Sequence, residues 1–365
     1  MALECLEFLM QEITEISIEK VDEKMLENLV TWQYNGSKST IDEFRTLSRE
    51  MQYEVIDFIK DFMIYEELTV NGKTYVVEEA KPESFDGIDI ALFAGGSISK
   101  TLAPEAAKRG AIVIDNSSAF RMDPEVPLVV PEVNPEDILK HKGIIANPNC
   151  STIIMSLGLK PLHDISPIKR IVVSTYQAVS GAGKEGIEEL ENQVKQYTAG
   201  EEMTANLLPT GSAPKHYPVA FNLLPQIDVF LDNDYTKEEM KMVHETQKIL
   251  HDDTIQVVPT TVRVPVYRSH SESVLVETEE PVSVEAFKAA CEKFPGLQVK
   301  DNPAEQIYPM PLYTSNQNDC EIGRIRKDLY NDKGMNFWIV GDQIRKGAAL
   351  NALQIAEYLV EKQAF

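Results

Sequence analysis

Cys150 is the residue in this chain whose surroundings best suit a nucleophile. It lies in the polar run 147–152, after the apolar segment 143–146, which predicts a buried strand. The apolar residues that follow predict a helix, which Ser151 or Thr152 could cap. Because free N–H groups and the dipole at a helix start stabilise negative charge, this position favours a thiolate. The alternative is a plain buried cysteine, and the polar neighbours argue against it.

A cysteine nucleophile needs an acid or base partner, which can be distant in sequence. The chain has six histidines. His270 lies at the junction of two predicted strands and is the first candidate, and His216 is the second. The other four lie among charged residues near predicted helix ends, where solvated rings are expected. Arg263, in the strand that leads towards His270, could clamp a carboxylate through its planar guanidinium.

Residues 181–186 match the pattern G-x-G-x-x-G after a predicted strand. The match lies halfway along the chain, and the residues just before it are polar and irregular. A single match of this kind is weak evidence for a dinucleotide site. We interpret it as a glycine loop that lets the backbone approach a ligand.

Composition excludes several classes of protein. The four cysteines are widely scattered, without CxxC or Cys/His metal spacing, which fits a reducing cytoplasm. The net charge of −23 disfavours nucleic acid and anionic membrane surfaces as partners. No apolar run reaches the length of a membrane span, and the acidic start is not a signal peptide.

The N-terminal part differs in character from the rest. Residues 1–71 are acidic and carry apolar residues at helical spacing. They predict a helical hairpin broken near Asn35 and Gly36, with a capping box formed by Thr40 and Glu43. We assign no chemistry to this segment.

From Gly72 onward, apolar strands alternate with helices. The predicted strands are 74–78, 88–94, 111–114 and 143–146, with a helix at 102–109. Such a pattern is typical of a parallel sheet that is covered on both faces. The polar residues at the strand ends are where sheets of this kind bind ligands.

After Cys150 the strands become longer and alternate. The predicted strands are 170–178, 255–267, 273–279 and 335–340, and the predicted helices are 184–197, 237–250 and 284–294. This pattern indicates an α+β second domain with a mostly antiparallel sheet. A last helix, 344–361, is expected to pack back on the first domain.

From about residue 72 to residue 365 the chain resembles the bacterial aspartate-semialdehyde dehydrogenases. The resemblance rests on segments in matching order: 115–121, 129–134, 148–152, 174–183, 215–218, 234–241, 263–270 and 341–343. It implies an α/β fold with an incomplete Rossmann-like parallel sheet domain (72–150 and 343–365). An α+β catalytic and dimerisation domain (151–342) would follow, and 1–71 would be an extra helical segment.

The resemblance also implies an activity. It is the NADPH-dependent reductive dephosphorylation of L-aspartyl 4-phosphate to L-aspartate 4-semialdehyde through a cysteine thioester. This reaction belongs to the biosynthesis of lysine, threonine, methionine and diaminopimelate. The expected protein is a cytoplasmic homodimer or homotetramer without a metal and without a nucleic acid or membrane partner.

The family's functional residues match positions of this sequence. Cys150 matches the nucleophile, His270 the acid/base residue and Gln177 the residue that orients the carbonyl. Arg263 matches the clamp on the substrate carboxylate, and Glu238 the partner of its ammonium. The implied phosphate ligands are Arg121, Asn149 and Lys241, and the implied NADP contacts are Ser180, Gly181, Gln343, Gly96 and Asn116.

The sequence departs from the family at its start. Family members begin with a strand and a Gly-Ala-Thr-Gly-x-x-Gly turn that holds the cofactor pyrophosphate, and neither occurs in residues 1–70. Two alternatives therefore stay open. One is a cofactor-deficient, inactive chimeric or truncated member. The other is an enzyme like N-acetylglutamyl-phosphate reductase, against which Glu238 argues because an acetylated amine has no charge to pair.

Overall fold

The computed structural model describes residues 67–70, 73–76 and 79–364, within two compact units, 1–80 and 81–365. In the first unit, the described residues form an antiparallel hairpin of β1 (Glu67–Val70) and β2 (Lys73–Val76). The prediction of helix up to residue 71 is therefore wrong at β1. The predicted helical hairpin and the capping box at Thr40 lie outside the described residues.

A parallel three-stranded sheet opens the second unit. Its strands, in the order β3-β4-β5, are β3 (Ile90–Phe93), β4 (Ile112–Asp115) and β5 (Ile144–Ala146). The predicted strands at 88–94, 111–114 and 143–146 are thus confirmed, with slightly different ends.

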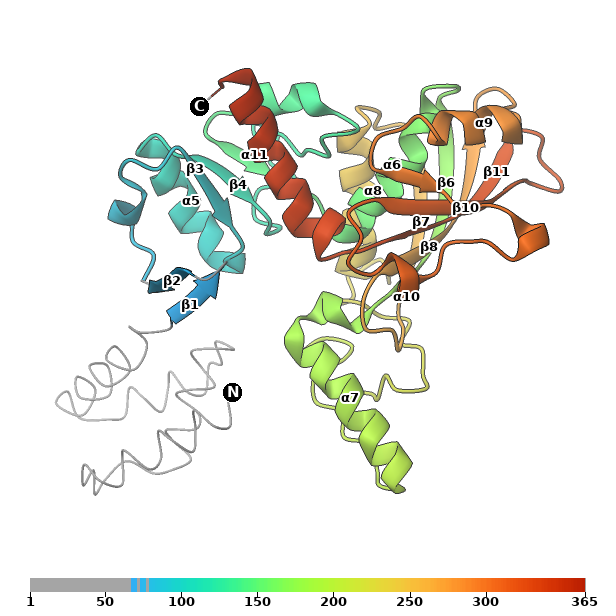
Figure 1. The fold of residues 1–365 in the computed structure, drawn as a ribbon, viewed down its shortest axis with the longest axis horizontal. Helices are drawn as coiled ribbons and strands as arrows, with labels where there is room; N and C mark the ends of the chain where they lie inside the picture. Colours follow the sequence, from blue (N-terminus) through green and yellow to red (C-terminus); the bar gives the residue numbers. More distant parts are fainter. Residues whose placement is uncertain (1–66, 71–72, 77–78, 365) are drawn as a thin grey trace. The chain divides into compact units, whose positions relative to one another are not determined.

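Helices cover both faces of this sheet. α5 (Ser99–Lys108) packs its alanines against Val113, and α11 (Leu350–Lys362) packs Ile355 against Ile112. Neighbouring residues of a strand point to opposite faces, so the two helices lie on opposite sides. Figure 1 shows α5 and α11 beside β3 and β4. This arrangement confirms that the last helix packs back on the first sheet.

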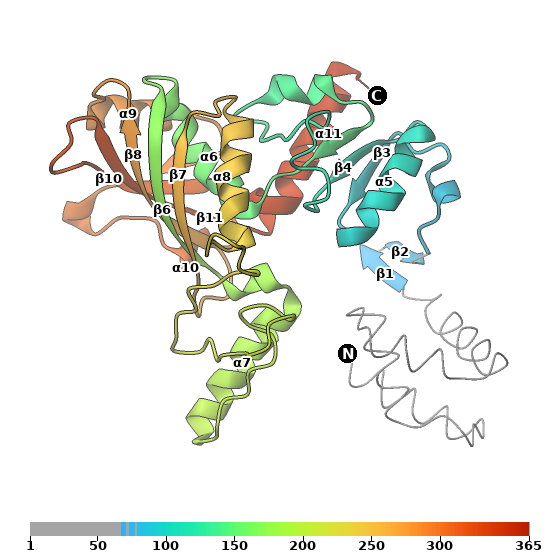
Figure 2. The ribbon, with the colours of Figure 1, turned by 180° about the vertical axis from the view of Figure 1, so that it is seen from behind.

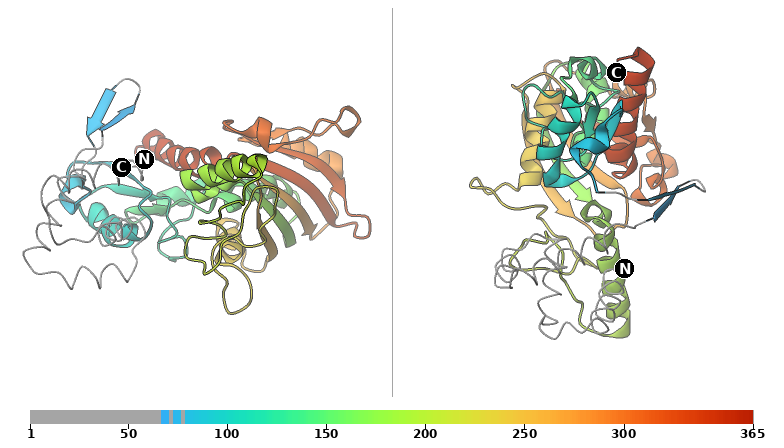
Figure 3. Two further views of the ribbon diagram at one scale, coloured as in Figure 1. Left: turned by 90° about the horizontal axis from the view of Figure 1, so that it is seen from below. Right: turned by 90° about the vertical axis from the view of Figure 1, so that its left-hand side faces the viewer.

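A six-stranded mixed sheet forms the larger part of the unit. Its order is β7-β6-β8-β11-β10-β9, with parallel pairs at β6–β7 and β9–β10 and antiparallel pairs elsewhere. The strands are β6 (Ile168–Gln177), β7 (Gln256–Arg263), β8 (His270–Thr278), β9 (Leu297–Val299), β10 (Cys320–Lys327) and β11 (Gly334–Gly341). Figure 3 shows them from the side as one twisted layer. The mostly antiparallel character is confirmed, but β9 and β10 were not predicted.

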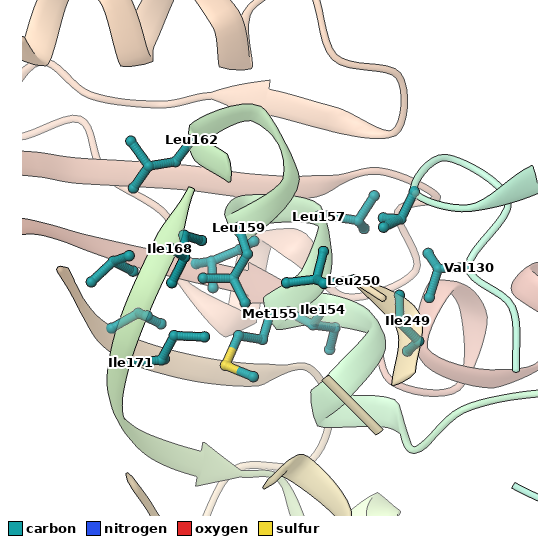
Figure 4. Close-up of a cluster of buried hydrophobic side chains, with 14 of the residues drawn as sticks. Val130, Ile154, Met155, Leu157, Leu159, Leu162, Ile168, Ile171, Ile249 and Leu250 are labelled. Atoms are coloured by element: carbon teal, nitrogen blue, oxygen red, sulfur yellow. The ribbon is translucent and has the colours of Figure 1, made fainter. Parts of the chain in front are cut away.

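Three helices cover one face of the six-stranded sheet: α6 (Cys150–His163), α8 (Lys237–Ile249) and α9 (Val284–Cys291). α6 is almost entirely buried, because it packs on the sheet between α8 and α9 and shares its core with Val126, Leu128 and Val130. Figure 2 shows α6 beside α8. Figure 4 shows its side chains Met155 and Leu159 among those of Ile168 and Ile171 in the main core. Burying a large apolar side chain of this kind stabilises a fold by about 1.5–3 kcal/mol. The start of α6, and with it Cys150, is therefore rigidly held.

The remaining elements connect these layers. They are the short helices η1 (Pro82–Phe85), η2 (Gly96–Ile98), η3 (Pro135–Lys140), η4 (Val179–Ala182), η5 (Pro303–Glu305), η6 (Arg345–Ala349) and α10 (Pro311–Thr314), and the longer α7 (Lys184–Ala199). η6 is a π-helix that leads into α11, where one continuous helix was predicted. Within the described residues, no helix has both the length and the apolar character to cross a membrane.

Candidate active site

Cys150 is the first residue of α6, directly after β5 and a short polar turn. The Asn149 side chain caps this helix: its Oδ1 accepts hydrogen bonds from the backbone N–H groups of Ser151 (3.0 Å) and Thr152 (3.3 Å). The prediction that Ser151 or Thr152 caps the helix is therefore wrong. Asn149 in turn donates its own backbone N–H to Glu245 at 2.6 Å.

The surroundings of the Cys150 thiol favour its neutral form. Burial and the nearby charge of Glu238 raise its pKa to about 12, against the smaller opposite effects of Arg121 and Arg263. The prediction of a favoured thiolate is wrong for this state, because a helix terminus stabilises charge by only about 0.3–2 kcal/mol. Activation of the thiol must come from something that changes these surroundings.

Three strand ends bring the other predicted catalytic groups to one edge of the six-stranded sheet. β6 ends at Gln177, the parallel β7 ends at Arg263 in register with it, and the antiparallel β8 begins at His270. All three side chains are almost completely buried. A protein places such polar groups in its interior only when they have partners or a function.

His270 is held as a neutral ring. The backbone N–H of Ala178 donates to Nδ1 at 3.1 Å, so the ring proton lies on Nε2, which has no partner in the described part of the chain. Burial, followed by the charge of Arg263, lowers the His270 pKa well below its ordinary value. The ring therefore presents a hydrogen-bond donor to the site.

Arg263 is a buried cation with unused donors. Its Nη1 donates to the Ala178 carbonyl oxygen at 2.7 Å, and its Nε has no hydrogen-bond partner among the described residues. Among the described residues, no carboxylate lies within ion-pair distance of the Arg263 guanidinium. A Cβ on Gly181 would lie 2.7 Å from Nη1 of Arg263 and 3.2 Å from Cε1 of His270, so a side chain at this position would displace the Arg263 guanidinium.

Glu238 connects the substrate residues with the nucleophile's turn. Its carboxylate accepts hydrogen bonds from Asn149 (2.9 Å) and Gln177 (3.3 Å) and pairs with Lys241 at 3.0 Å. Burial alone would raise the Glu238 pKa, but Lys241 and Asn149 hold it below its ordinary value. Lys241 also pairs with Asp228 at 3.1 Å.

Arg121 reaches the site from the loop after β4. It pairs with the buried Glu245 at 3.2 Å and donates to the carbonyl oxygen of Asn116 at 2.9 Å. Glu245 was missed in the sequence, although it lies seven residues after Glu238 and therefore on the same face of a predicted helix. His216, in contrast, contacts the carbonyl oxygen of Thr210 at 3.2 Å and nothing in this site.

Comparisons with known proteins identify the family of this chain. Family models described as "Semialdehyde dehydrogenase, NAD binding domain" and "Semialdehyde dehydrogenase, dimerisation domain" match residues 60–141 and 159–346. The aspartate-semialdehyde dehydrogenase of Aquifex aeolicus is 56% identical over 81% of this chain and 86% of its own length. That of Bacillus subtilis is 52% identical over 80% of this chain and 85% of its own length. The chain belongs to the aspartate-semialdehyde dehydrogenase family.

A solved member of the family has a similar fold. The crystal structure of aspartate semialdehyde dehydrogenase II from Vibrio cholerae matches with a TM-score of 0.77 and 44% identity, over 84% of this chain and 89% of that one. The same enzyme complexed with ASA matches with a TM-score of 0.76. The first family model begins at residue 60, upstream of the boundary near residue 72 predicted from the sequence.

The residues predicted to contact the cofactor fall into two groups. Gln343 accepts the backbone N–H of Ser269 at 2.9 Å and donates to the Ser180 hydroxyl, next to Gly181 and His270. Gly96 and Asn116 instead follow β3 and β4, at the carboxyl edge of the parallel sheet. At Gly96 the φ is +59°, and an added Cβ would meet no atom within 4 Å. The described residues also contain no cluster of side chains suited to a metal ion.

Glu272 was not predicted and has an unusual environment. It lies two residues after His270 on β8, is fully buried, and neither carboxyl oxygen has a partner in the described part of the chain. Burial raises its pKa well above the ordinary value. The folded protein therefore holds this carboxyl in its neutral form.

Replacing Glu272 with glutamine is expected to stabilise the protein increasingly as the pH rises. The pKa of Glu272 is higher in the folded protein than in the unfolded protein. The neutral carboxyl therefore contributes its full stability below the unfolded pKa of about 4.3, and this contribution falls as the pH rises from there to the folded pKa. Within that window the variant should gain about 1.4 kcal/mol over the parent per pH unit. Urea unfolding of both proteins between about pH 5 and pH 8 measures this difference.

Glu277→Gln is the matched control, because Glu277 lies on the same strand but pairs with Arg170 at a half-exposed position. Its stability relative to the parent is measured over the same pH range. A stability difference for Glu272→Gln that stays constant across the same pH range contradicts the assignment of a neutral buried carboxyl.

Proposed function

We propose that this chain catalyses the NADPH-dependent reductive dephosphorylation of L-aspartyl 4-phosphate to L-aspartate 4-semialdehyde through a thioester on Cys150. The observation that carries the proposal is the buried guanidinium of Arg263, which has no ion pair in the described residues and lies beside Cys150 and His270. A cation with free donors at such a position is suited to the carboxylate of a substrate.

Two opposite charges orient an amino acid in this site. Arg263 binds the α-carboxylate, and Glu238, which is held in its charged form, binds the ammonium. The side-chain acyl group then reaches Cys150. An N-acetylated substrate has no ammonium for Glu238, so the geometry favours the free amino acid over the N-acetylglutamyl compound.

Substrate binding also supplies the missing activation of the thiol. Glu238 is one of the charges that raise the Cys150 pKa, so an ammonium paired with Glu238 cancels part of that effect. The same pairing releases Lys241 from Glu238. Lys241 and Arg121 then stabilise the phosphate, together with Asn149.

The first chemical step follows from this arrangement. The Cys150 sulfur forms a bond to the acyl carbon, and the bond from that carbon to the phosphate oxygen breaks. Phosphate leaves with the electron pair and takes up the proton that the thiol gives up. Gln177 and the Nε2–H of His270 donate hydrogen bonds to the carbonyl oxygen, which gains negative charge during the attack. When the aldehyde is later released, the bond from its carbon to the Cys150 sulfur breaks, and His270 supplies the proton that this sulfur takes up.

A nicotinamide dinucleotide, when bound, supplies the hydride that reduces the thioester carbon. Ser180, Gly181 and Gln343 would hold its nicotinamide half, and Gly96 and Asn116 would contact it at the carboxyl ends of β3 and β4. The open backbone at Gly96 fits this role, since ligands of parallel sheets bind at that edge. The three-stranded sheet carries no G-x-G-x-x-G turn for the pyrophosphate in the described residues.

We also propose the organisation of the whole protein. Residues 72–150 and 343–365 form the nucleotide-binding domain, and 151–342 form the catalytic domain, through which two or four chains associate. The family description of a dimerisation domain supports this association. Its place of action is the cytoplasm.

The test follows the reaction in two parts. With aspartate semialdehyde, phosphate and NADP, the chain should produce NADPH only when phosphate is present, and N-acetylglutamate semialdehyde should be a poor substrate. With aspartyl phosphate and no cofactor, it should release one phosphate per chain as the thioester forms. Phosphate release without any NADP reduction would favour the cofactor-deficient alternative, and the absence of both would contradict the proposal.

A further inference from the structure

The chain passes from the six-stranded sheet to α11 through η6, a π-helix that lies directly against the nucleophile. A Cβ on Gly347 in this turn would lie 3.0 Å from Cβ and 3.4 Å from Cα of Cys150. Gln343, just before this turn, accepts a hydrogen bond from the backbone N–H of Ser269 and donates one to the Ser180 hydroxyl. π-Helical turns are rare and need local support, so something must keep this turn in place.

The support comes from the buried side chain of Lys346, which is only 1% exposed. Its Nζ donates to Glu132 at 2.6 Å, to Asn351 at 2.8 Å and to Gln354 at 2.6 Å. Gln354 returns a hydrogen bond to the second oxygen of Glu132 at 2.9 Å. All three donors of the ammonium and both oxygens of the carboxylate are thus satisfied.

The same network reaches the other side of Cys150. Asn351 donates to Oδ1 of Asn147 at 2.6 Å, and Asn147 donates to the carbonyl oxygen of Ala348 in η6 at 3.2 Å. Asn147 belongs to the short turn that leads into Cys150. The Lys346 network therefore contacts both the turn before the nucleophile and the π-helix packed against it.

Resting on the proposed role of Cys150, we propose that the Lys346–Glu132 pair is a positioning device for the nucleophile. It fixes η6 and, through Asn351 and Asn147, the turn before α6, so that the Cys150 sulfur faces the acyl carbon. Neither residue contacts the substrate in this role. A buried ion pair is an uncertain source of stability, because desolvation opposes its Coulomb attraction, whereas a fully bonded pair selects one arrangement of the chain.

The test compares this buried ion pair with an exposed ion pair that has the same distance between nitrogen and oxygen. Glu132→Gln and Lys346→Met disturb the buried pair, and Glu125→Gln and Lys142→Met disturb the Glu125–Lys142 pair, which is also 2.6 Å long. The buried-pair variants should lose at least about tenfold in kcat with KM changed less than about twofold, the pattern of a lost positioning interaction. The exposed-pair variants should keep both constants.

Alkylation by iodoacetamide gives a readout that does not depend on turnover. A loosened η6 should make Cys150 react at least about threefold faster, since access controls thiol reactivity along with its pKa. Cys291 and Cys320 are fully buried, and their continued protection shows that the variant is folded. Among the three cysteines that the structure describes, the change is therefore expected at Cys150 alone.

The outcomes separate the two proposals. Folded variants that keep the parent's kcat and Cys150 alkylation rate, and lose only thermal stability, overturn the positioning role. If the parent itself has no activity, the proposed function fails, while the alkylation rates still decide the positioning role. If Lys346→Met exposes Cys291 and Cys320, Glu132→Gln decides, because glutamine keeps an amide oxygen for Lys346.

Discussion

Replacing Cys150 with serine is expected to lower the turnover of aspartate semialdehyde by at least about 10⁴-fold, the scale on which removal of a covalent nucleophile acts. The substrate charges still meet Arg263 and Glu238 in the variant, so substrate binding should remain. A serine hydroxyl, however, is far less acidic than a thiol. Neutralising Glu238 therefore cannot bring it to a useful fraction of alkoxide.

Two measurements check this expectation. NADPH formation reports the whole reaction, and the single-turnover release of phosphate from aspartyl phosphate reports acylation alone. Both should disappear in Cys150→Ser. Cys291→Ala is the matched control, because Cys291 is a cysteine in the core of the same unit and not in the site. Phosphate release by Cys150→Ser at the parent's stoichiometry would assign the acyl transfer to another residue.

The local sequence was sufficient for those features of the site that depend on neighbours along the chain. The strand before Cys150 and the helix after it follow from a change of apolar pattern within twenty residues. Gln177 and His270 could be placed near strand ends for the same reason, whereas Arg263 was placed inside a predicted strand that ran on to residue 267; β7 ends at Arg263. That these ends meet at one edge depends on the register of three strands, which comes from the resemblance and not from periodicity.

Features that depend on distant packing could not be predicted from the same patterns. The Cys150 thiolate was wrongly favoured, because the helix start is visible locally while Glu238 and the burial by Gly347 come from far along the chain. Glu272 gives no local signal, since its neighbours on β8 also alternate between polar and apolar residues. β10 was missed because glycine and charged residues interrupt its apolar pattern.

Substitutions of His270 should distinguish its two ring nitrogens. His270→Asn is expected to lose about 10²–10⁴-fold in kcat, the usual contribution of a positioned proton donor or acceptor. His270→Gln should retain at least about tenfold more activity than His270→Asn, because the glutamine amide reaches the position of Nε2, which faces the site. Asparagine reaches only the position of Nδ1, where its oxygen can still accept the Ala178 N–H.

The pH dependence of kcat provides a second check on His270. Because burial and Arg263 hold its pKa well below the ordinary value, the ring stays neutral down through the range near pH 6.5 in which a solvated histidine titrates. The profile of the parent should therefore lack an acidic limb there, and His270→Gln should show a lower plateau of the same shape. An acidic limb near about pH 6.5 that the glutamine variant removes would show that His270 titrates during turnover. In that case the hydrogen bond from Ala178 must break when substrate binds, the ring proton moves to Nδ1, and Nε2 acts as the base.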